Sequence, residues 1–171
     1  MKPNREGAEI GFASVASQRP LADRIEVGAP RLAALAAQAV ARSPEPVRRR
    51  ALQSAFGRAR DAFNRGDFDV VFALFATHVE YGPPPPLHDG APLQGRTAVF
   101  NFWRDVDARY DESTIENLSL EEAAPGYIVR TARLHHRSSA TGDELSYVIK
   151  QTTELVGGRV VRQINVLAED P

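Results

Sequence analysis

The last third of the sequence constrains the fold most, because three segments of alternating apolar and polar residues follow one another with only short breaks. They read YIVRTARLHHR (127–137), ELSYVIKQTTEL (144–155) and RVVRQINVL (159–167). Such alternation is typical of strands with one face toward a core, and breaks built from Ser, Thr and Gly are typical of hairpin turns. The sequence therefore predicts an antiparallel sheet.

The turns predict a register for these strands. Closing the SSATG turn symmetrically sets Arg130 opposite Gln151. A three-residue VGG loop with a left-handed glycine pairs Gln151 with Gln163 and brings Asn165 one step further on. Because alternate residues share a face, one set of side chains is predicted to point inward: Ile128, Arg130, Ala132, Leu134, His136, Leu145, Tyr147, Ile149, Gln151, Thr153, Val161, Gln163, Asn165 and Leu167.

Helical periodicity marks the segments upstream of the sheet. Apolar residues spaced by three and four predict a short accessory helix over 31–42 and a longer helix over 43–65. Gly66 tolerates the left-handed conformation that ends a helix, and Asp67 can cap a helix that restarts at once. A further helix is predicted to begin near Gly95.

The remaining upstream segments are a short strand, a loop and a tail. HVEY is predicted as a strand, and the four prolines that follow form an extended loop, because proline lacks the donor that a strand ladder requires. The N-terminal segment mixes Gly, Pro, Ser and charge without periodicity, which favours flexibility. The predicted organisation is a flexible tail over 1–30, the accessory helix over 31–42 and one folded domain over 43–171.

The composition excludes several classes of protein. Lys and Arg (21) nearly balance Asp and Glu (22), so a net charge of −1 creates no global field to attract nucleic acid or an anionic membrane. The absence of cysteine removes disulfides, thiolate zinc sites and thiol nucleophiles. No apolar run reaches the length of a signal-peptide core or a membrane span. We expect a soluble, cytoplasmic protein without a nucleic-acid or membrane partner.

The order of these segments resembles the nuclear transport factor 2-like (NTF2-like) superfamily, and within it the SnoaL-like group related to polyketide cyclases. The resemblance covers roughly residues 50 to 168 and is carried by AFNRGDFDVVFALFATHVEY, LQGRTAVFNFWRDV, SSATGDELSYVIKQTTEL and GGRVVRQINV. It implies an α+β fold in which a cone-shaped, strongly curved antiparallel sheet holds helices on its concave face, preceded here by an extra N-terminal helix. It also implies a pocket at the open end and frequent dimerisation through sheets.

A polar row on the inward face is the main candidate binding feature. Arg130, Gln151 and Gln163 are predicted to be adjacent across three strands, with Asn165 one step on. A guanidinium flanked by amides can bind a carboxylate, phosphate or enolate oxygen. The alternative is that Arg130 reaches the cone rim or pairs with an acidic helix residue, without touching a ligand. The predicted aromatic wall, which could equally be core, consists of Tyr81, Trp103 and Tyr147.

Catalytic candidates are fewer. Enzymes of the resembled superfamily generally place an Asp or Glu in the cone as general base, whereas the predicted inward face carries no carboxylate. Besides Arg130, the candidate catalytic residues are His136, whose unperturbed pKa near 6.5 suits acid–base chemistry, and Glu80, which competes with Tyr81 for the inward face. His135 and His136 are sequential in a strand and point to opposite faces, so no metal site is predicted and no cofactor is expected.

Three classes of function remain open from the sequence. The first is binding of a hydrophobic or aromatic small molecule with an anionic group. The second is acid–base catalysis of the isomerase, cyclase or dehydratase type on a cyclic or polyketide-like carbonyl compound. The third is a non-catalytic interaction module. The outward sheet face mixes Val129, Ile164 and Val166 with charges of both signs, which predicts a sheet-to-sheet homodimer.

Overall fold

The structure, a computed structural model, describes residues 19–169 of the chain. Its helices are α2 (Leu21–Gly28), α3 (Pro30–Ala41), α4 (Glu45–Asn64), α5 (Phe68–Val71) and α6 (Arg96–Arg109). Its strands are β1 (Phe75–Gly82), β2 (Leu93–Gln94), β3 (Glu112–Ala124), β4 (Tyr127–Arg137), β5 (Glu144–Val156) and β6 (Arg159–Leu167). The predicted α+β class is confirmed.

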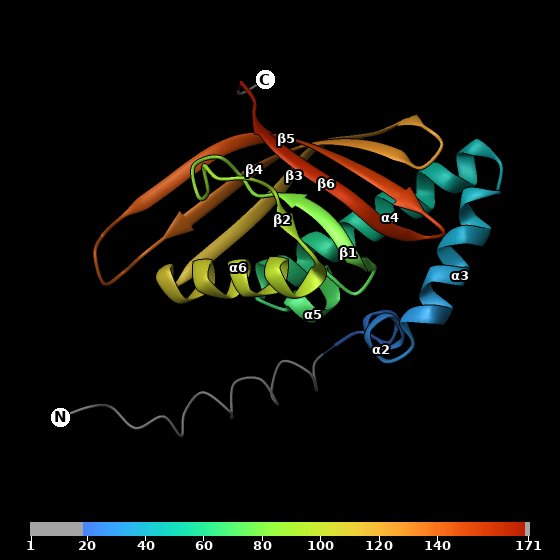
Figure 1. Cartoon of the computed structure of the whole chain (residues 1–171), viewed down its shortest axis with the longest axis horizontal. Helices are drawn as coiled ribbons and strands as arrows, with labels where there is room; N and C mark the ends of the chain where they lie inside the picture. Colours follow the sequence, from blue (N-terminus) through green and yellow to red (C-terminus); the bar gives the residue numbers. More distant parts are fainter. Residues whose placement is uncertain (1–18, 170–171) are drawn as a thin grey trace.

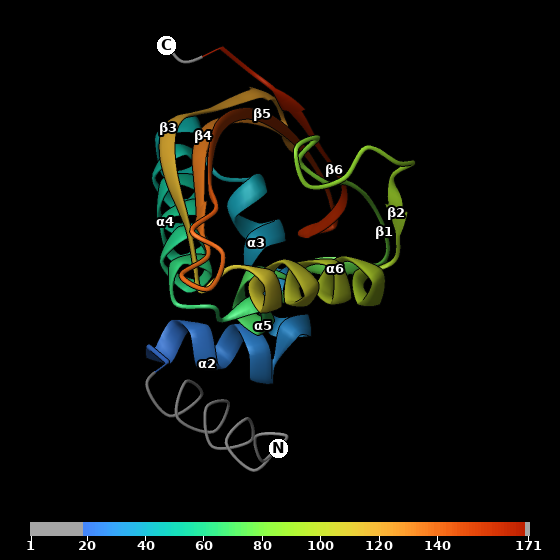
Figure 2. The same cartoon turned by 90° about the vertical axis from the view of Figure 1, so that its left-hand side faces the viewer.

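One curved sheet dominates the fold. Its strand order is β2-β1-β6-β5-β4-β3, and neighbouring strands are antiparallel except for the parallel pair β1 and β6. The sheet arches over α5 and α6, while α4 runs beside β3 (Figures 1 and 2). The concave face therefore holds helices, as the resemblance implied.

Aromatic side chains fill the core beneath the arch. Phe63 of α4 meets Trp103 of α6 edge to face with ring centres 5.0 Å apart, and Phe72 meets Phe75 in the same way at 5.0 Å. Large rings packed in this geometry contribute both buried apolar area and a favourable ring–ring interaction. They hold α4, α5 and α6 in fixed positions under the strands.

The predicted helix end after α4 is confirmed, whereas the predicted cap at Asp67 is not formed. α4 ends at Asn64, and Gly66 adopts a left-handed φ of 73°. The Asn64 side chain donates to the carbonyl of Ile115 and accepts from its N–H, which ties the helix end to β3. Asp67 makes no capping hydrogen bond, because its buried carboxylate accepts two from Arg19, at 2.8 and 2.7 Å.

The register of the sheet agrees with the prediction in one hairpin and differs in the other. Arg130 faces Gln151 across β4 and β5, as predicted. Across β5 and β6, however, Gln151 faces Asn165, and Gln163 faces Thr153. The predicted pairing of Gln151 with Gln163 is therefore wrong by two residues.

The cause of this shift lies in the turn and in a bulge next to it. Gly157 and Gly158 form a two-residue turn with both glycines at positive φ, instead of a three-residue loop. A bulge beyond Glu154 then adds one more residue to β6. Because the total shift is even, most inward positions keep their face. At the bulge itself Val160 is buried, rather than the predicted Val161.

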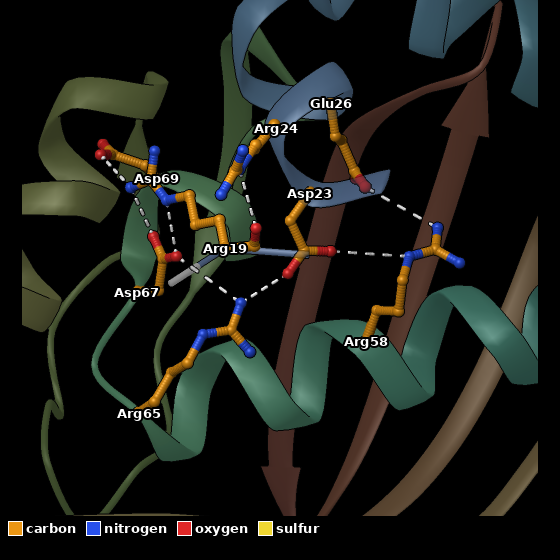
Figure 3. A network of polar contacts seen from close by, with 8 residues as sticks. All are labelled: Arg19, Asp23, Arg24, Glu26, Arg58, Arg65, Asp67 and Asp69. Atoms are coloured by element: carbon orange, nitrogen blue, oxygen red, sulfur yellow. Dashed lines mark hydrogen bonds and ion pairs between the residues drawn. The ribbon is translucent and has the colours of Figure 1, made fainter. Parts of the chain in front are cut away.

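The prediction of a flexible tail over 1–30 is wrong for its last part, which forms α2. Asp23 anchors this helix with a side chain that is nearly fully buried. Its carboxylate accepts a hydrogen bond from Arg65 at 2.5 Å and lies 3.9 Å from Arg58 (Figure 3). Local sequence periodicity does not reveal ion pairs between segments so far apart. Residues 1–18 lie outside the described residues.

The accessory helix predicted over 31–42 is present as α3. Its leucines point to the outside of the molecule: Leu32 is 63% exposed and Leu35 is 61% exposed. Figure 1 shows α3 at the end of the arch, next to the turn that joins β5 and β6. The start of the folded domain at residue 43 stays a prediction.

Candidate functional site

A cavity of about 640 Å³ lies between the inner face of the sheet, α4 and the α2–α3 pair. This volume is in the range of sites that hold drug-sized ligands. Aliphatic and aromatic side chains make up most of the wall. The sheet adds a group of buried polar side chains: Arg130, Gln151, Thr153, Gln163 and Asn165.

Arg130 lines the cavity from the middle of β4 and is only 6% exposed. Its guanidinium carbon lies 5.5 Å from the centre of the Phe56 ring, a cation–π contact. Within residues 19–169, no carboxylate pairs with it, and its Nε has no hydrogen-bond partner. Burial lowers the pKa of Arg130 to about 10, so the side chain is still charged at neutral pH. The alternative in which Arg130 pairs with an acidic helix residue is therefore wrong.

The amides beside Arg130 form a short hydrogen-bonded chain. Gln151 donates from Nε2 to Oδ1 of Asn165 at 2.9 Å, and Asn165 donates from Nδ2 to a backbone carbonyl of β1 at 2.7 Å. Gln163 lies one step closer to the β5–β6 turn, where Thr153 donates to its Oε1 at 3.4 Å. The predicted row is thus corrected: Gln151 and Asn165 continue it from Arg130, and Gln163 is displaced toward the turn.

Tyr81 and Trp103 line the same cavity. Tyr81 is 2% exposed and takes the inward face of β1, and Trp103 donates its indole N–H to the Tyr81 hydroxyl at 2.9 Å. Burial raises the pKa of Tyr81, so its hydroxyl stays protonated. The two side chains are therefore held in place by each other while presenting aromatic surface to the cavity.

His136 and Tyr147 lie apart from the cavity lining. His136 is fully buried, and its Nδ1 lies 2.9 Å from the Ser113 hydroxyl. Its Nε2 lies 3.1 Å from the Tyr147 hydroxyl. Burial lowers the pKa of His136 to about 4, so the ring is neutral at neutral pH. Tyr147, predicted to be part of the aromatic wall, packs on this histidine instead.

The structure separates the candidate carboxylate Glu80 from the cavity and brings another carboxylate to it. Glu80 lies on the outer face of β1, where Arg162 donates to it at 3.3 Å, so it does not reach the cavity. The inward positions predicted on β4, β5 and β6 include no carboxylate, but Glu122 of β3, a strand for which no inward face was predicted, lines the cavity and accepts from Arg48 at 2.9 Å. Glu122 stands directly opposite inward-facing Ile128 in the β3–β4 ladder, whose register shifts at two places.

The family assignment follows from a sequence match that spans most of this site. The family described as SnoaL-like domain matches residues 56–163, more than half of the chain. The chain belongs to the SnoaL-like domain family of the NTF2-like superfamily. A search of curated proteins gives no significant match.

Solved structures resemble this SnoaL-like protein in fold. An NTF2-like protein of unknown function from Burkholderia pseudomallei is 19% identical, with a TM-score of 0.58 over 68% of this chain and 89% of that one. IdmH from Streptomyces antibioticus, a proposed polyketide cyclase, is 16% identical, with a TM-score of 0.56 over 66% and 88%. TerC, co-crystallised with polyporic acid, is 14% identical, with a TM-score of 0.57 over 67% and 89%.

Sequence reasoning missed two contributors to the cavity, one at the first residue of the SnoaL-like match and one before it. Phe56 stands at the start of the match, and its contact with Arg130 joins residues far apart in the chain. α2 and α3 lie before the match, yet both line the cavity. The small residues of α3 could have been noticed as a face of their own, opposite the leucines.

Residues 19–169 contain no cluster of three or more His, Cys, Asp or Glu side chains that could hold a metal ion. No helix within the same range is long and apolar enough to cross a membrane.

Proposed function

We propose that this SnoaL-like protein binds a small, mainly apolar or aromatic molecule that carries one anionic or enolate-like oxygen. Arg130 is the anchor for that oxygen, and Gln151 is the neighbouring amide. The apolar cavity wall, with Tyr81 and Trp103, accepts the body of the ligand.

The observation that carries this proposal is the buried, unpaired guanidinium of Arg130. A charge that is removed from water without a partner costs several kcal/mol of stability. An anionic ligand would offset this cost, because a charge-assisted hydrogen bond in a dry site is stronger than one in water. The size of the cavity further supports binding over a filled-in interaction module.

The structural neighbours add support of a weaker kind. IdmH is a proposed polyketide cyclase, and TerC was crystallised with polyporic acid. Both share the fold at low identity, so they support a small-molecule role for this architecture and leave the ligand open. The cytoplasmic location and the sheet-to-sheet homodimer stay predictions.

The test compares two aromatic probes that differ in one group, naphthoate and naphthylmethanol, by titration calorimetry at neutral pH. A charged anchor predicts that the carboxylate binds at least about tenfold more tightly than the alcohol. Equal affinity for the two probes would contradict the proposed anchor, while binding of neither would contradict the proposed ligand class.

Acid–base catalysis on a cyclic or polyketide-like carbonyl compound is the second candidate, and one observation favours it. Glu26 of α2 lines the cavity, and burial raises its pKa, which brings a carboxyl group closer to the range that a general acid needs. Arg58, 3.7 Å away, acts in the opposite direction. Glu26→Gln should abolish turnover of such a compound without changing naphthoate affinity, and unchanged turnover would rule out Glu26.

A further inference from the structure

The α2–α3 pair adds a wall to the cavity from outside the region that matches the family. The SnoaL-like match begins at residue 56, whereas α2 and α3 occupy residues 21–41. Both helices nevertheless contribute side chains to the cavity lining. The shape of the cavity in this chain therefore depends on a segment that the family's common domain does not supply.

α3 presents mainly small side chains to the cavity and its leucines to the outside. Ala33, Ala37 and Val40, spaced by four and three residues, line the cavity on one face of the helix. Leu32 and Leu35, on another face, are exposed. A helix that served only to bury apolar surface would be rotated the other way, with its leucines inward.

α3 is held against the sheet at one close approach. Gly158, in the β5–β6 turn, packs so tightly on the carbonyl of Ala34 that a Cβ at this position would collide with that oxygen. Arg159 also donates to the carbonyl of Pro30, at 3.4 Å. α3 thus closes the end of the cavity at which the β5–β6 turn lies.

The distance between Arg130 and α3 can be followed along β5. Gln151 stands opposite Arg130, and Thr153 and Leu155 are the next residues of β5 that line the cavity toward the turn. At a strand rise of about 3.3 Å per residue, the step from Gln151 to Leu155 spans about 13 Å. A ligand anchored at Arg130 can extend over that length before it meets α3.

We propose that α3 sets the upper size limit of the ligand, with Ala33 and Val40 as specificity-determining residues. The row of small residues faces a cavity that also contains the unpaired, 6% exposed Arg130, so both features belong to one ligand site. The proposal rests on the proposed binding function and adds the length of the ligand to it.

The experiment measures dissociation constants for n-alkyl carboxylates from octanoate to hexadecanoate, and for the matching primary alcohols. Ala33→Leu should weaken the longest carboxylates about tenfold or more and leave octanoate unchanged, because three added carbons fill the far end of the cavity. Val40→Ala should extend the tolerated length. Ala39→Leu is the matched control, because Ala39 is exposed on the same helix and does not line the cavity.

A glycine pair tests the position of α3 separately. Gly157 and Gly158 both have positive φ, so an alanine strains either position, but only at Gly158 would the new methyl group meet α3. Gly157 also lines the cavity, but a methyl group there meets no neighbouring atom, so Gly158→Ala should change the length preference more than Gly157→Ala does.

The outcomes separate the two proposals. Alcohols that bind as tightly as carboxylates would refute the Arg130 anchor, while the length limit could still be read from the alcohol series. If Ala33→Leu and Val40→Ala leave the length preference unchanged, or weaken short and long ligands equally, α3 is not the wall that limits size. Binding of neither series would overturn both proposals.

Discussion

Arg130 stands directly opposite Gln151 in the β4–β5 ladder, and its guanidinium is buried without a carboxylate partner among residues 19–169. The amide of Gln151 is already engaged with Asn165. The Phe56 ring is therefore the group that offsets part of the cost of burying the Arg130 charge, and a cation–π contact is weaker than an ion pair. A polar group left in this state in a cavity wall is better suited to a ligand than to the fold.

Replacing Arg130 should accordingly stabilise the ligand-free protein. Arg130→Met removes an unpaired buried charge and keeps most of the stem volume, so we expect the free energy of unfolding to rise by about 1–3 kcal/mol in urea titrations. Arg162→Met, on the exposed outer face of β6, should change stability by less than about 0.5 kcal/mol. A large loss of stability in Arg130→Met would mean that the guanidinium has a structural partner.

His136 should make the stability of the protein depend on pH. Burial holds the folded-state pKa of His136 at about 4, below the unfolded value of about 6.5, so the unfolded chain takes up the proton first. Its contribution to stability is complete above pH 6.5 and falls by about 1–3 kcal/mol as the pH drops toward 4.

Urea titrations between pH 7 and 4 measure this loss. His136→Gln should flatten that part of the profile, since glutamine does not titrate. His135→Gln is the control, because His135 lies half-buried on the opposite face of the same strand. If His136→Gln and the parent protein lose stability in parallel over this range, another group is responsible.

The sequence predicted the part of the site that depends on local pattern. Alternation and a symmetric turn placed Arg130 opposite Gln151 and pointed both inward. Of Glu80 and Tyr81, which competed for the inward face of β1, the structure turns the aromatic side chain inward. These features follow from the two-residue period of a strand, which tolerates errors in the exact turn.

The features that sequence reasoning missed depend on irregular backbone or on distant contacts. The Gly157–Gly158 turn and the bulge beyond Glu154 moved Gln163 away from Gln151. Glu122 lies on β3, for which no inward face was predicted and whose register shifts at two places. A bulge inserts a residue without a reliable sequence signal. α2 was missed because its anchor, Asp23, finds its partners more than thirty residues later in α4 and just beyond it.

The anchor of α2 can be tested by one isosteric change. Asp23→Asn removes the charge that Arg65 and Arg58 face, so we expect a loss of about 1–3 kcal/mol and faster amide hydrogen exchange in α2 and α3. Asp61→Asn, at an exposed pair with Arg60, should have little effect. Equal effects of the two changes would show that α2 does not depend on this network.

The predicted homodimer can be tested at the outer face of the sheet. Val166 is 49% exposed beside Ile164 and the charged residues of that face, a mixture suited to an interface. Val166→Asp should shift sedimentation from dimer to monomer at micromolar concentration without lowering the melting temperature. A parent protein that sediments only as monomer would refute the dimer.

Titration of naphthoate into Arg130→Met and Arg162→Met tests most directly whether Arg130 binds the anionic group of the ligand. Loss of a charge-assisted anchor in a dry site should cost about 2–5 kcal/mol, or about thirtyfold or more in Kd, for Arg130→Met alone. Arg162→Met should bind as the parent does. If Arg130→Met binds naphthoate as tightly as the parent protein, Arg130 is not the anchor.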